Sequence, residues 1–122
     1  MPGLPAECVA RNGRIYVDEY NRVKGLEDSV CAVGDIAQME TPEYPKGYPM
    51  VAQPAIQQAR NLAKNLNKGE FQTKFKYSDR GSMATVGRNR AVADLPGFSF
   101  AGRMAWWIWM VIHLVSILGM RN

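Results

Sequence analysis

Residues 30–37 read Val-Cys-Ala-Val-Gly-Asp-Ile-Ala, and this stretch decides the expected fold. Residues 30–33 are a short apolar run with two β-branched side chains, which predicts a buried strand. Gly34 allows the backbone to turn tightly or to lie close to a ligand. Asp35 then places a carboxylate at the carboxyl end of the strand, where α/β sheets bind ligands. Taken alone, the stretch favours a simpler interpretation, in which Asp35 is the N-cap of a following helix.

A helix is predicted further along the chain, over about residues 50–67. Apolar residues recur there at three- and four-residue spacing, so they share one face that we expect to be buried: Ala52, Ala55, Ile56, Ala59, Leu62, Ala63 and Leu66. Pro54 fits only near the start of a helix, where its missing N–H has no intrahelical partner anyway. Lys68 and Gly69 form a typical helix end.

Two glutamines lie near the start of this helix. Gln53 and Gln57 are four residues apart, so they lie on one face, one turn from each other. Two neutral amides offer donors and acceptors without a charge, which suits a neutral carbonyl group of a ligand. By spacing alone, two solvated glutamines on a helix surface are the more common arrangement.

The remaining elements are shorter. A strand at 14–18 follows a turn signal and is expected to form a hairpin with Val23. Residues 40–49 are rich in Pro, Gly and Tyr and predict no regular element. Antiparallel strands are expected over about residues 74–95, and an apolar helix over about residues 99–119. Its apolar part is about 15 residues long, short of the roughly 20 that span a bilayer.

Charge is divided unevenly along the 122 residues. Residues 1–47 have a net charge of −3, and residues 48–122 have a net charge of +7. A basic half that ends in an apolar helix with three tryptophans indicates an anionic membrane surface. A nucleic-acid partner is not expected, since no nucleic-acid-binding motif accompanies the charge. The two cysteines form no C-x-x-C motif, and Cys31 is expected to be a small core residue in the strand.

His113 is the single histidine, and it lies among tryptophans and aliphatic residues. No Cys, Asp or Glu lies at metal-ligand spacing from it, so we expect no metal site. A hydrogen-bonded or interfacial histidine is the preferred interpretation. The chain also shows no nucleophile triad and no paired carboxylates, so no catalytic side chain is assigned.

The ordered set of motifs resembles the type II NADH dehydrogenases, the single-subunit NADH:quinone oxidoreductases. Residues 30–37 resemble the second flavin-binding segment of the two-dinucleotide-binding flavoprotein reductases, and Ala52–Gln57 matches the family pattern A-Q-x-x-x-Q. Residues 76–89 and the Trp-rich segment that ends at residue 122 are similar to the stretches that follow in the family. The resemblance covers nearly the whole chain. It implies an α+β fold, the C-terminal fragment of a two-dinucleotide-binding-domain flavoprotein with small β hairpins.

The resemblance also implies a set of ligand contacts. FAD is expected at Gly34, Asp35, Ile36, Ala37, Ala52 and Gln53, with the Asp35 carboxylate on the ribityl chain. Quinone is expected at Gln53, Gln57 and a lysine, for which Lys76 is the candidate and Arg80 a rival for that role. By this alignment, residues 1–67 belong to the FAD-binding domain, and residues 68–122 form the strands and a membrane-associating helix.

The chain contains no G-x-G-x-x-G, the turn that brings backbone amides to a pyrophosphate. The family has one such turn for FAD and another for NADH, so this chain resembles the family's C-terminal portion. We therefore expect weak or absent FAD binding by these residues alone. For the parent protein, the implied reaction is hydride transfer from NADH to FAD, followed by two-electron reduction of a membrane quinone without proton pumping.

The implied location is the cytoplasmic face of the bacterial inner membrane, with peripheral attachment through the C-terminal helix. A homo-oligomer is expected, because half of a flavin domain exposes a sheet edge that invites pairing. Two alternatives stay open. One is a membrane-surface or protein-interaction module without catalysis, and the other is a different FAD-dependent pyridine nucleotide reductase.

Overall fold

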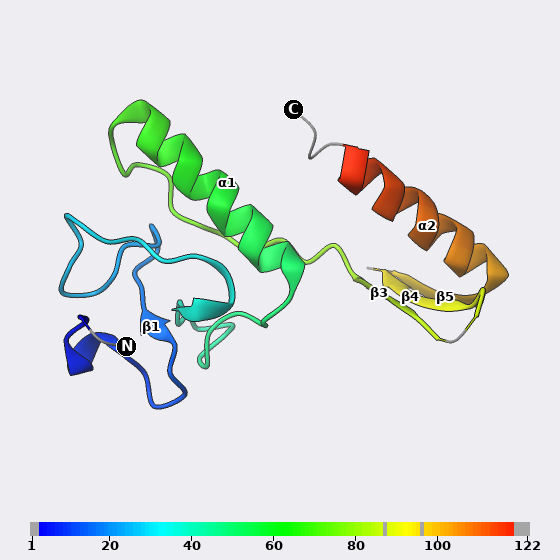
Figure 1. Cartoon of the computed structure of the whole chain (residues 1–122), viewed down its shortest axis with the longest axis horizontal. Coiled ribbons are helices and arrows are strands. Elements are labelled where there is room, and N and C mark those ends of the chain that lie inside the picture. The colour runs from blue at the N-terminus through cyan, green and yellow to red at the C-terminus, as the bar shows by residue number, and fades with distance from the viewer. Residues whose placement is uncertain (1–2, 87, 96, 119–122) are drawn as a thin grey trace. The chain divides into compact units, whose positions relative to one another are not determined.

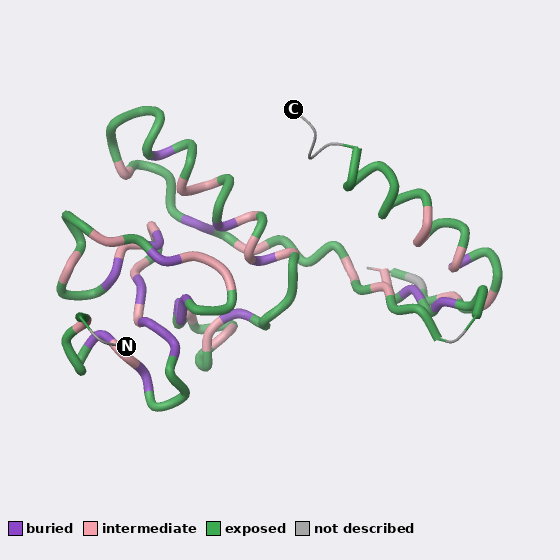
Figure 2. The backbone as a smooth tube through the Cα atoms, viewed as in Figure 1, coloured by how far each residue is buried: buried purple, intermediate pink, exposed green. Residues whose placement is uncertain are grey.

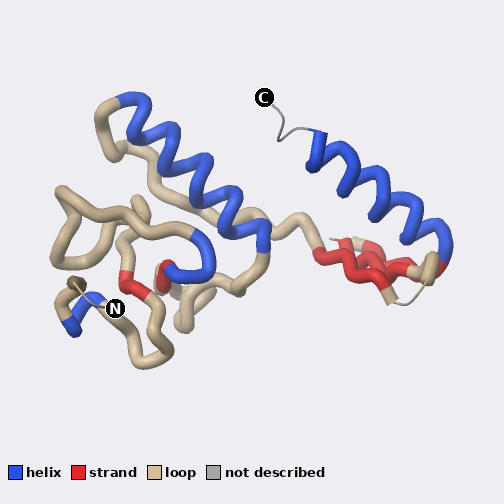
Figure 3. Tube along the Cα trace, viewed as in Figure 1, coloured by secondary structure: helices blue, strands red, loops and turns tan. Residues whose placement is uncertain are grey.

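The structure is a computed structural model that describes residues 3–86, 88–95 and 97–118. It divides into two compact units, residues 1–78 and 79–122 (Figure 1). Each unit has a hydrophobic cluster of its own. Small sheets and two long helices give a mixed α+β fold, as the sequence predicts (Figure 3).

The first unit is built around a two-stranded parallel sheet. The strand β1 (Ile15–Tyr16) pairs with β2 (Ala37–Gln38), and the short 3-10 helix η1 (Ala6–Cys8) precedes them. The hairpin expected to reach Val23 is confirmed by an antiparallel bridge between Val17 and Val23. Its turn is held by Asp18, because Oδ1 of this residue accepts hydrogen bonds from the backbone N–H groups of Tyr20 and Arg22, each at 2.9 Å.

The prediction of a strand at residues 30–33 is wrong. This segment has a single isolated bridge, between Cys31 and Arg22, and regular pairing begins only at β2. Cys31, which was expected to be buried, is exposed because one bridge does not cover it with a neighbouring strand. Partial desolvation raises the pKa of the Cys31 thiol, which disfavours a reactive thiolate.

The helix expected after Asp35 is replaced by a single turn of 3-10 helix, η2 (Gly34–Ile36). Gly34 has a φ of 74°, so the chain changes direction there and enters β2 three residues later. Asp35 is therefore not an N-cap. That position belongs to Val33, which makes no side-chain capping bond.

The predicted helix at 50–67 is confirmed as α1 (Ala52–Lys68). It ends as expected at Gly69, which has a φ of 71° and donates its N–H to the last turn. The prediction of its buried face is wrong, since Ile56 is 49% exposed and Leu66 is 58% exposed. Much of α1 is in the exposed or intermediate class (Figure 2). The buried residues of α1 are Pro54, Gln58 and Asn65.

The core of the first unit lies beneath the hairpin and the irregular loop 40–49. Val17, Val23 and Met39 are at most 1% exposed. Tyr48 and Phe75 close this core with ring centroids 5.4 Å apart in an edge-on arrangement. The aromatic packing fixes a loop that has no regular backbone pairing of its own.

The second unit is a three-stranded antiparallel meander followed by a helix. The strands are β3 (Ser82–Thr85), β4 (Ala91–Leu95) and β5 (Phe98–Gly102), and the helix is α2 (Arg103–Leu118). The helix packs on the sheet through Ala105, which is fully buried with Ala91 and Ala93. Small side chains at these three positions let the helix approach the strands closely.

The predicted boundaries in this unit need two corrections. Residues 74–81 form no strand, and the first four residues of the helix expected at 99–119 lie in β5. Gly102 has a φ of 107°, which lies outside the right-handed helical region, so the helix starts only at Arg103. Residue 119 lies outside the described residues. Among those that the structure describes, no helix is long and apolar enough to cross a membrane.

Candidate functional site

The η2 turn lies directly against the first half of α1. The position that a Cβ atom would occupy on Gly34 is 3.2 Å from the Cβ atom of Ala55, tighter than an ordinary contact. The backbone N–H of Gly34 donates a hydrogen bond of 2.7 Å to Oε1 of Gln58, whose side chain is 1% exposed. Glycine is required at this position by both the backbone angle and the close approach of the helix.

The four predicted ligand contacts around this turn differ in exposure. Asp35 and Ile36 are exposed, and Gly34 is half-buried. Within the part of the chain that the structure describes, the Asp35 carboxylate accepts no hydrogen bond, so it is available to a hydroxyl group. Ala37 is 1% exposed, and its carbonyl already accepts a hydrogen bond from Arg14, so this residue faces the protein core.

The other two predicted flavin-contacting residues are at the amino end of α1. Ala52 is exposed at the first position of the helix, and Gln53 is half-buried at the second. Val51 holds the N-cap position and offers no side-chain oxygen to the first N–H groups. The end of the helix thus keeps its partial positive charge, which stabilises nearby negative charge.

A row of amide side chains joins α1 to the segment that follows it. Asn65 is fully buried, and its amide both donates to the carbonyl of Thr73, at 2.9 Å, and accepts from the N–H of Thr73, at 3.0 Å. Gln57 pairs in the same way with the peptide of Ser78, at 2.9 and 3.0 Å. Asn61 adds a fifth bond, because its Nδ2 donates to the Thr73 carbonyl. The amides of α1 thus hold two points, Thr73 and Ser78, of a segment that forms no strand.

The structure thus brings the predicted quinone residues onto one part of the first unit. Gln57 holds the backbone two residues after Lys76, and the Lys76 side chain is exposed. Gln53 lies one helical turn before Gln57 on α1. Arg80, the rival of Lys76, belongs to the second unit.

The sequence reasoning missed Gln58, Asn61 and Asn65. Their signal is the four-residue spacing of three uncharged amides, at 57, 61 and 65, with Gln58 beside the first. Side chains at this spacing lie on one face of a helix, and neutral amides are suited to satisfy buried backbone groups. The search for an apolar face hid this polar face, although the polar face is the one that packs.

Close to Ser78, an aromatic cluster connects the loop 40–49 to residues 75–77. The Tyr48 ring lies 5.4 Å from the Tyr77 ring and 4.8 Å from the Tyr44 ring, measured between centroids. Burial raises the pKa of the Tyr48 hydroxyl, although hydrogen bonds with the Thr41 side chain and the Tyr77 backbone oppose the rise. Burial therefore favours the protonated, neutral form of the Tyr48 phenol.

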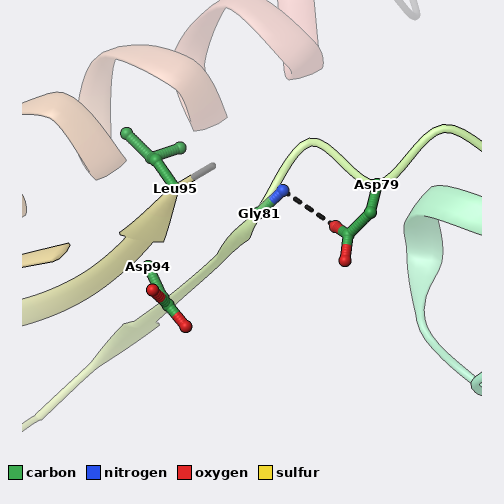
Figure 4. A pocket seen from close by; sticks show the side chains of 4 residues that line it. All are labelled: Asp79, Gly81, Asp94 and Leu95. Carbon is green, nitrogen blue, oxygen red and sulfur yellow. Dashed lines mark hydrogen bonds between the residues drawn. The ribbon is translucent and has the colours of Figure 1, made fainter. Parts of the chain in front are cut away.

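The second unit has a hollow at the start of its sheet, with a volume of about 450 Å³ (Figure 4). It is lined by Asp79, Gly81, Asp94 and Leu95. Oδ1 of Asp79 accepts a 2.8 Å hydrogen bond from the N–H of Gly81, and a Cβ atom on Gly81 would collide with the Asp94 carbonyl. None of the predicted ligand residues lines this hollow, and the Asp79 carboxylate serves a tight turn.

The C-terminal helix presents an apolar outer surface. Trp107 is 59% exposed, and with Ile108, Val111 and Ile112 it lines an apolar hollow of about 230 Å³. Nδ1 of His113 donates a 3.0 Å hydrogen bond to the Trp109 carbonyl, which confirms the expectation of a hydrogen-bonded histidine.

Comparisons with known proteins agree with this arrangement. Residues 80–122 match the family profile described as the NDH2 C-terminal domain. The type II NADH:quinone oxidoreductase Ndh of Mycobacterium tuberculosis is 38% identical over 128 residues, a match that covers 93% of this chain and 26% of that protein. The type II NADH:quinone oxidoreductase NdhA of the same organism is 40% identical over 121 residues, covering 93% of this chain and 24% of that protein.

The fold has a solved counterpart. The structure of NDH2 from Plasmodium falciparum in complex with NADH has a TM-score of 0.72 and 20% sequence identity, and the match covers 85% of this chain and 36% of that chain. The chain spans about a quarter of the length of the curated relatives it matches. The sequence matches, the family profile and the fold together assign this chain to the type II NADH dehydrogenase family, as a C-terminal portion of such a protein.

Proposed function

We propose that this chain is the C-terminal part of an FAD-dependent, non-proton-pumping NADH:quinone oxidoreductase. The observation that carries the proposal is the contact of the Gly34 turn with α1, because it gathers the predicted flavin and quinone residues in one unit. The names of the relatives support the same reaction for the parent protein. The fragment itself is expected to be inactive.

The residues present fit one part of FAD. The exposed Asp35 carboxylate can accept hydrogen bonds from the ribityl hydroxyls, and Gly34 lets a ligand approach the backbone. The uncapped start of α1, at Ala52 and Gln53, favours negative charge on the nearby ring. No residue set in the chain resembles a pyrophosphate-binding glycine turn, so the phosphate half has to be held elsewhere.

When bound, FAD would supply the redox chemistry by accepting a hydride from NADH and passing two electrons to the quinone. The chain's own residues then have binding and orienting roles. Gln53 and Gln57 offer amide donors to a quinone carbonyl from one side of α1, and Lys76 adds a positive charge two residues before the Ser78 peptide that Gln57 holds. Ala37 contributes through the position of its backbone rather than through its buried side chain.

The C-terminal helix is proposed as the membrane contact of the parent protein. Exposed Trp107, Val111 and Leu114 form an apolar surface that suits the interface of a bilayer, and the net charge of residues 48–122 is +7. Interfacial insertion together with basic charge suffices for peripheral attachment. We further propose that the parent protein attaches to the cytoplasmic face of the bacterial inner membrane and forms a homo-oligomer.

The decisive experiment uses a full-length enzyme that contains this segment. It should purify yellow and should oxidise NADH with a short-chain quinone as acceptor. A well-folded colourless protein would contradict the proposal and favour a module without catalysis. A yellow protein that oxidises NADH but leaves quinone oxidised would favour a different FAD-dependent pyridine nucleotide reductase.

The 122-residue chain provides a second measurement. Flavin fluorescence quenching should reveal weak or absent FAD binding, because only the ribityl and ring contacts are present. Tight binding would show that these residues hold the cofactor without the glycine turn. The proposal that the phosphate half of FAD is held outside this chain would then be wrong.

A further inference from the structure

Gln58 is the polar side chain that α1 directs at the flavin turn. It is 1% exposed, and its Oε1 accepts a 2.7 Å hydrogen bond from the N–H of Gly34. An N–H group can only donate, so the atom that faces it is the amide oxygen. Gln58 lies outside the A-Q-x-x-x-Q pattern, which ends at Gln57.

This hydrogen bond sets the orientation of one peptide. Gly34 has a φ of 74°, and α1 packs against the place where a Cβ atom would be, so the turn already lies close to the helix. The bond to Gln58 fixes the remaining freedom, rotation of the peptide that precedes Gly34. Gln58 is buried and Gly34 is half-buried, so removal of the acceptor leaves the N–H of Gly34 without its protein partner.

We infer that Gln58 is a positioning residue that holds the Gly34 turn and thereby aims the Asp35 carboxylate at the flavin ribityl chain. The inference rests on the proposed function, since it needs FAD beside Asp35. Gln58 itself is buried and does not touch the cofactor. It acts through the peptide of Gly34, which is followed directly by Asp35 in η2.

The neighbouring glutamine has a different partner. Gln57 pairs with the Ser78 peptide, whereas Gln58 pairs with Gly34. Two consecutive residues on α1 therefore connect the helix to the proposed quinone side and to the proposed flavin side. A change at Gln58 should disturb FAD binding without releasing Ser78.

Asn65 provides a matched control. It is a fully buried amide on the same helix, and its two bonds to Thr73 lie away from the Gly34 turn. Asn65→Leu removes buried hydrogen bonds of the same kind and should lower the melting temperature. It should leave the FAD dissociation constant within about threefold of wild type, because a threefold change is under 1 kcal/mol.

The test measures FAD affinity of the full-length enzyme by flavin fluorescence, well below the melting temperature. Gln58→Met removes the acceptor and should raise the dissociation constant about tenfold, because the half-buried N–H of Gly34 loses its partner and the turn loses its fixed orientation. Gln58→Glu keeps an acceptor oxygen in either protonation state and should restore affinity to within about threefold of wild type. The flavin circular dichroism should change in Gln58→Met and recover in Gln58→Glu.

Asp35 provides the test of mechanism. In a double-mutant cycle, Asp35→Ala should weaken FAD binding in the wild-type background and have little further effect in the Gln58→Met background. Additive effects would show that Gln58 does not act through Asp35, and the inference would be wrong. Gln58→Asn, whose amide is one methylene shorter, is the second variant if Gln58→Met does not fold, and it must also weaken FAD binding.

The outcomes separate the two proposals. If the wild-type enzyme holds no FAD, the proposed function fails and the inference fails with it. If the wild type binds FAD and folded Gln58→Met and Gln58→Asn bind it equally well, only the role of Gln58 is wrong. A loss of affinity in Asn65→Leu as large as that in Gln58→Met would show a general effect of stability and would overturn the inference as well.

Discussion

Gly34 and Gln58, 24 residues apart in the chain, are joined by a hydrogen bond of 2.7 Å that ties the turn before β2 to the helix α1. The first is held at a φ of 74°, and the second is 1% exposed. A turn with a positive φ, a close helix and a buried acceptor are three separate requirements at one place. Together they fix the backbone of the η2 turn, which lies directly before β2.

The first prediction concerns Gly34→Ala. We expect the free energy of unfolding to fall by about 2–3 kcal/mol, because alanine is strained in the left-handed backbone conformation and its Cβ atom would contact Ala55 too closely. Gly13→Ala is the control, since Gly13 has a φ of 83° with nothing within 4 Å of the added atom. It should cost only the backbone part, about 1–2 kcal/mol. Urea titration measures both, and equal losses would show that the contact with α1 is unimportant.

The second prediction concerns pH and Tyr48. Burial raises the pKa of this hydroxyl above its ordinary value of 10.0, so the folded state holds the proton more tightly than the unfolded chain. The resulting stabilisation is fully present below pH 10.0 and is lost as the pH rises through the folded-state pKa. As the pH rises above 10.0, the free energy of unfolding of wild type should therefore fall more steeply than that of Tyr48→Phe.

The control for Tyr48 is Phe75→Leu, which disturbs the same ring cluster without removing a titrating group. It should lower stability by a similar amount at every pH. Parallel curves for wild type and Tyr48→Phe between pH 9 and 12, measured by circular dichroism in urea, would show that the buried phenol has no part in alkaline unfolding.

Part of this architecture follows from the sequence, and the rest depends on backbone partners that are far apart in the chain. The helix α1 and its end at Gly69 follow from local spacing and from the freedom of glycine. The buried face of α1 does not, because Gln58 and Asn65 are buried by the backbone groups of Gly34 and Thr73 that they satisfy. Hydrophobic periodicity carries no information about such partners.

The candidate site, too, follows from the sequence only in part. Its residues were identified by resemblance, whereas their arrangement depends on amide bonds that only the structure reveals. Gln57 was expected as a ligand residue alone, and its amide also holds the Ser78 peptide at two points. Residues 74–81 form no strand, and within them a side chain of α1 holds Ser78 while the Glu19 carbonyl accepts from the N–H of Phe75.

The third prediction concerns Gln53→Ala and Gln57→Ala in the full-length enzyme. Both changes should lower the rate of quinone reduction about tenfold or more, and neither should greatly slow hydride transfer from NADH to the flavin, because the amides lie on the proposed quinone side. Stopped-flow absorbance separates the two half-reactions. Equal losses in both half-reactions would contradict the assignment.

Gln57 should differ from Gln53 in one further measurement. Gln57→Ala leaves the N–H of Ser78 without its acceptor, so hydrogen exchange at Ser78 should become faster. Gln57→Glu keeps an acceptor and should retain slow exchange there. Exchange at Ser78 that is the same in wild type and Gln57→Ala would show that this bond does not order the segment.

The fourth prediction concerns α2, which we expect to lie in the membrane interface. Trp107 is 59% exposed, whereas Trp109 packs against the cluster of Ala91, Ala93 and Ala105. Trp107→Ala should therefore weaken sedimentation of the full-length enzyme with anionic liposomes by about tenfold and leave the melting temperature nearly unchanged. Trp109→Ala should lower the melting temperature, because it removes a side chain packed on the sheet.

Deletion of residues 104–122 should abolish liposome binding, and high salt should weaken binding of the intact enzyme by screening its basic charges. Equal partitioning of the intact, truncated and Trp107→Ala proteins would mean that α2 is a packing helix and that another surface meets the membrane.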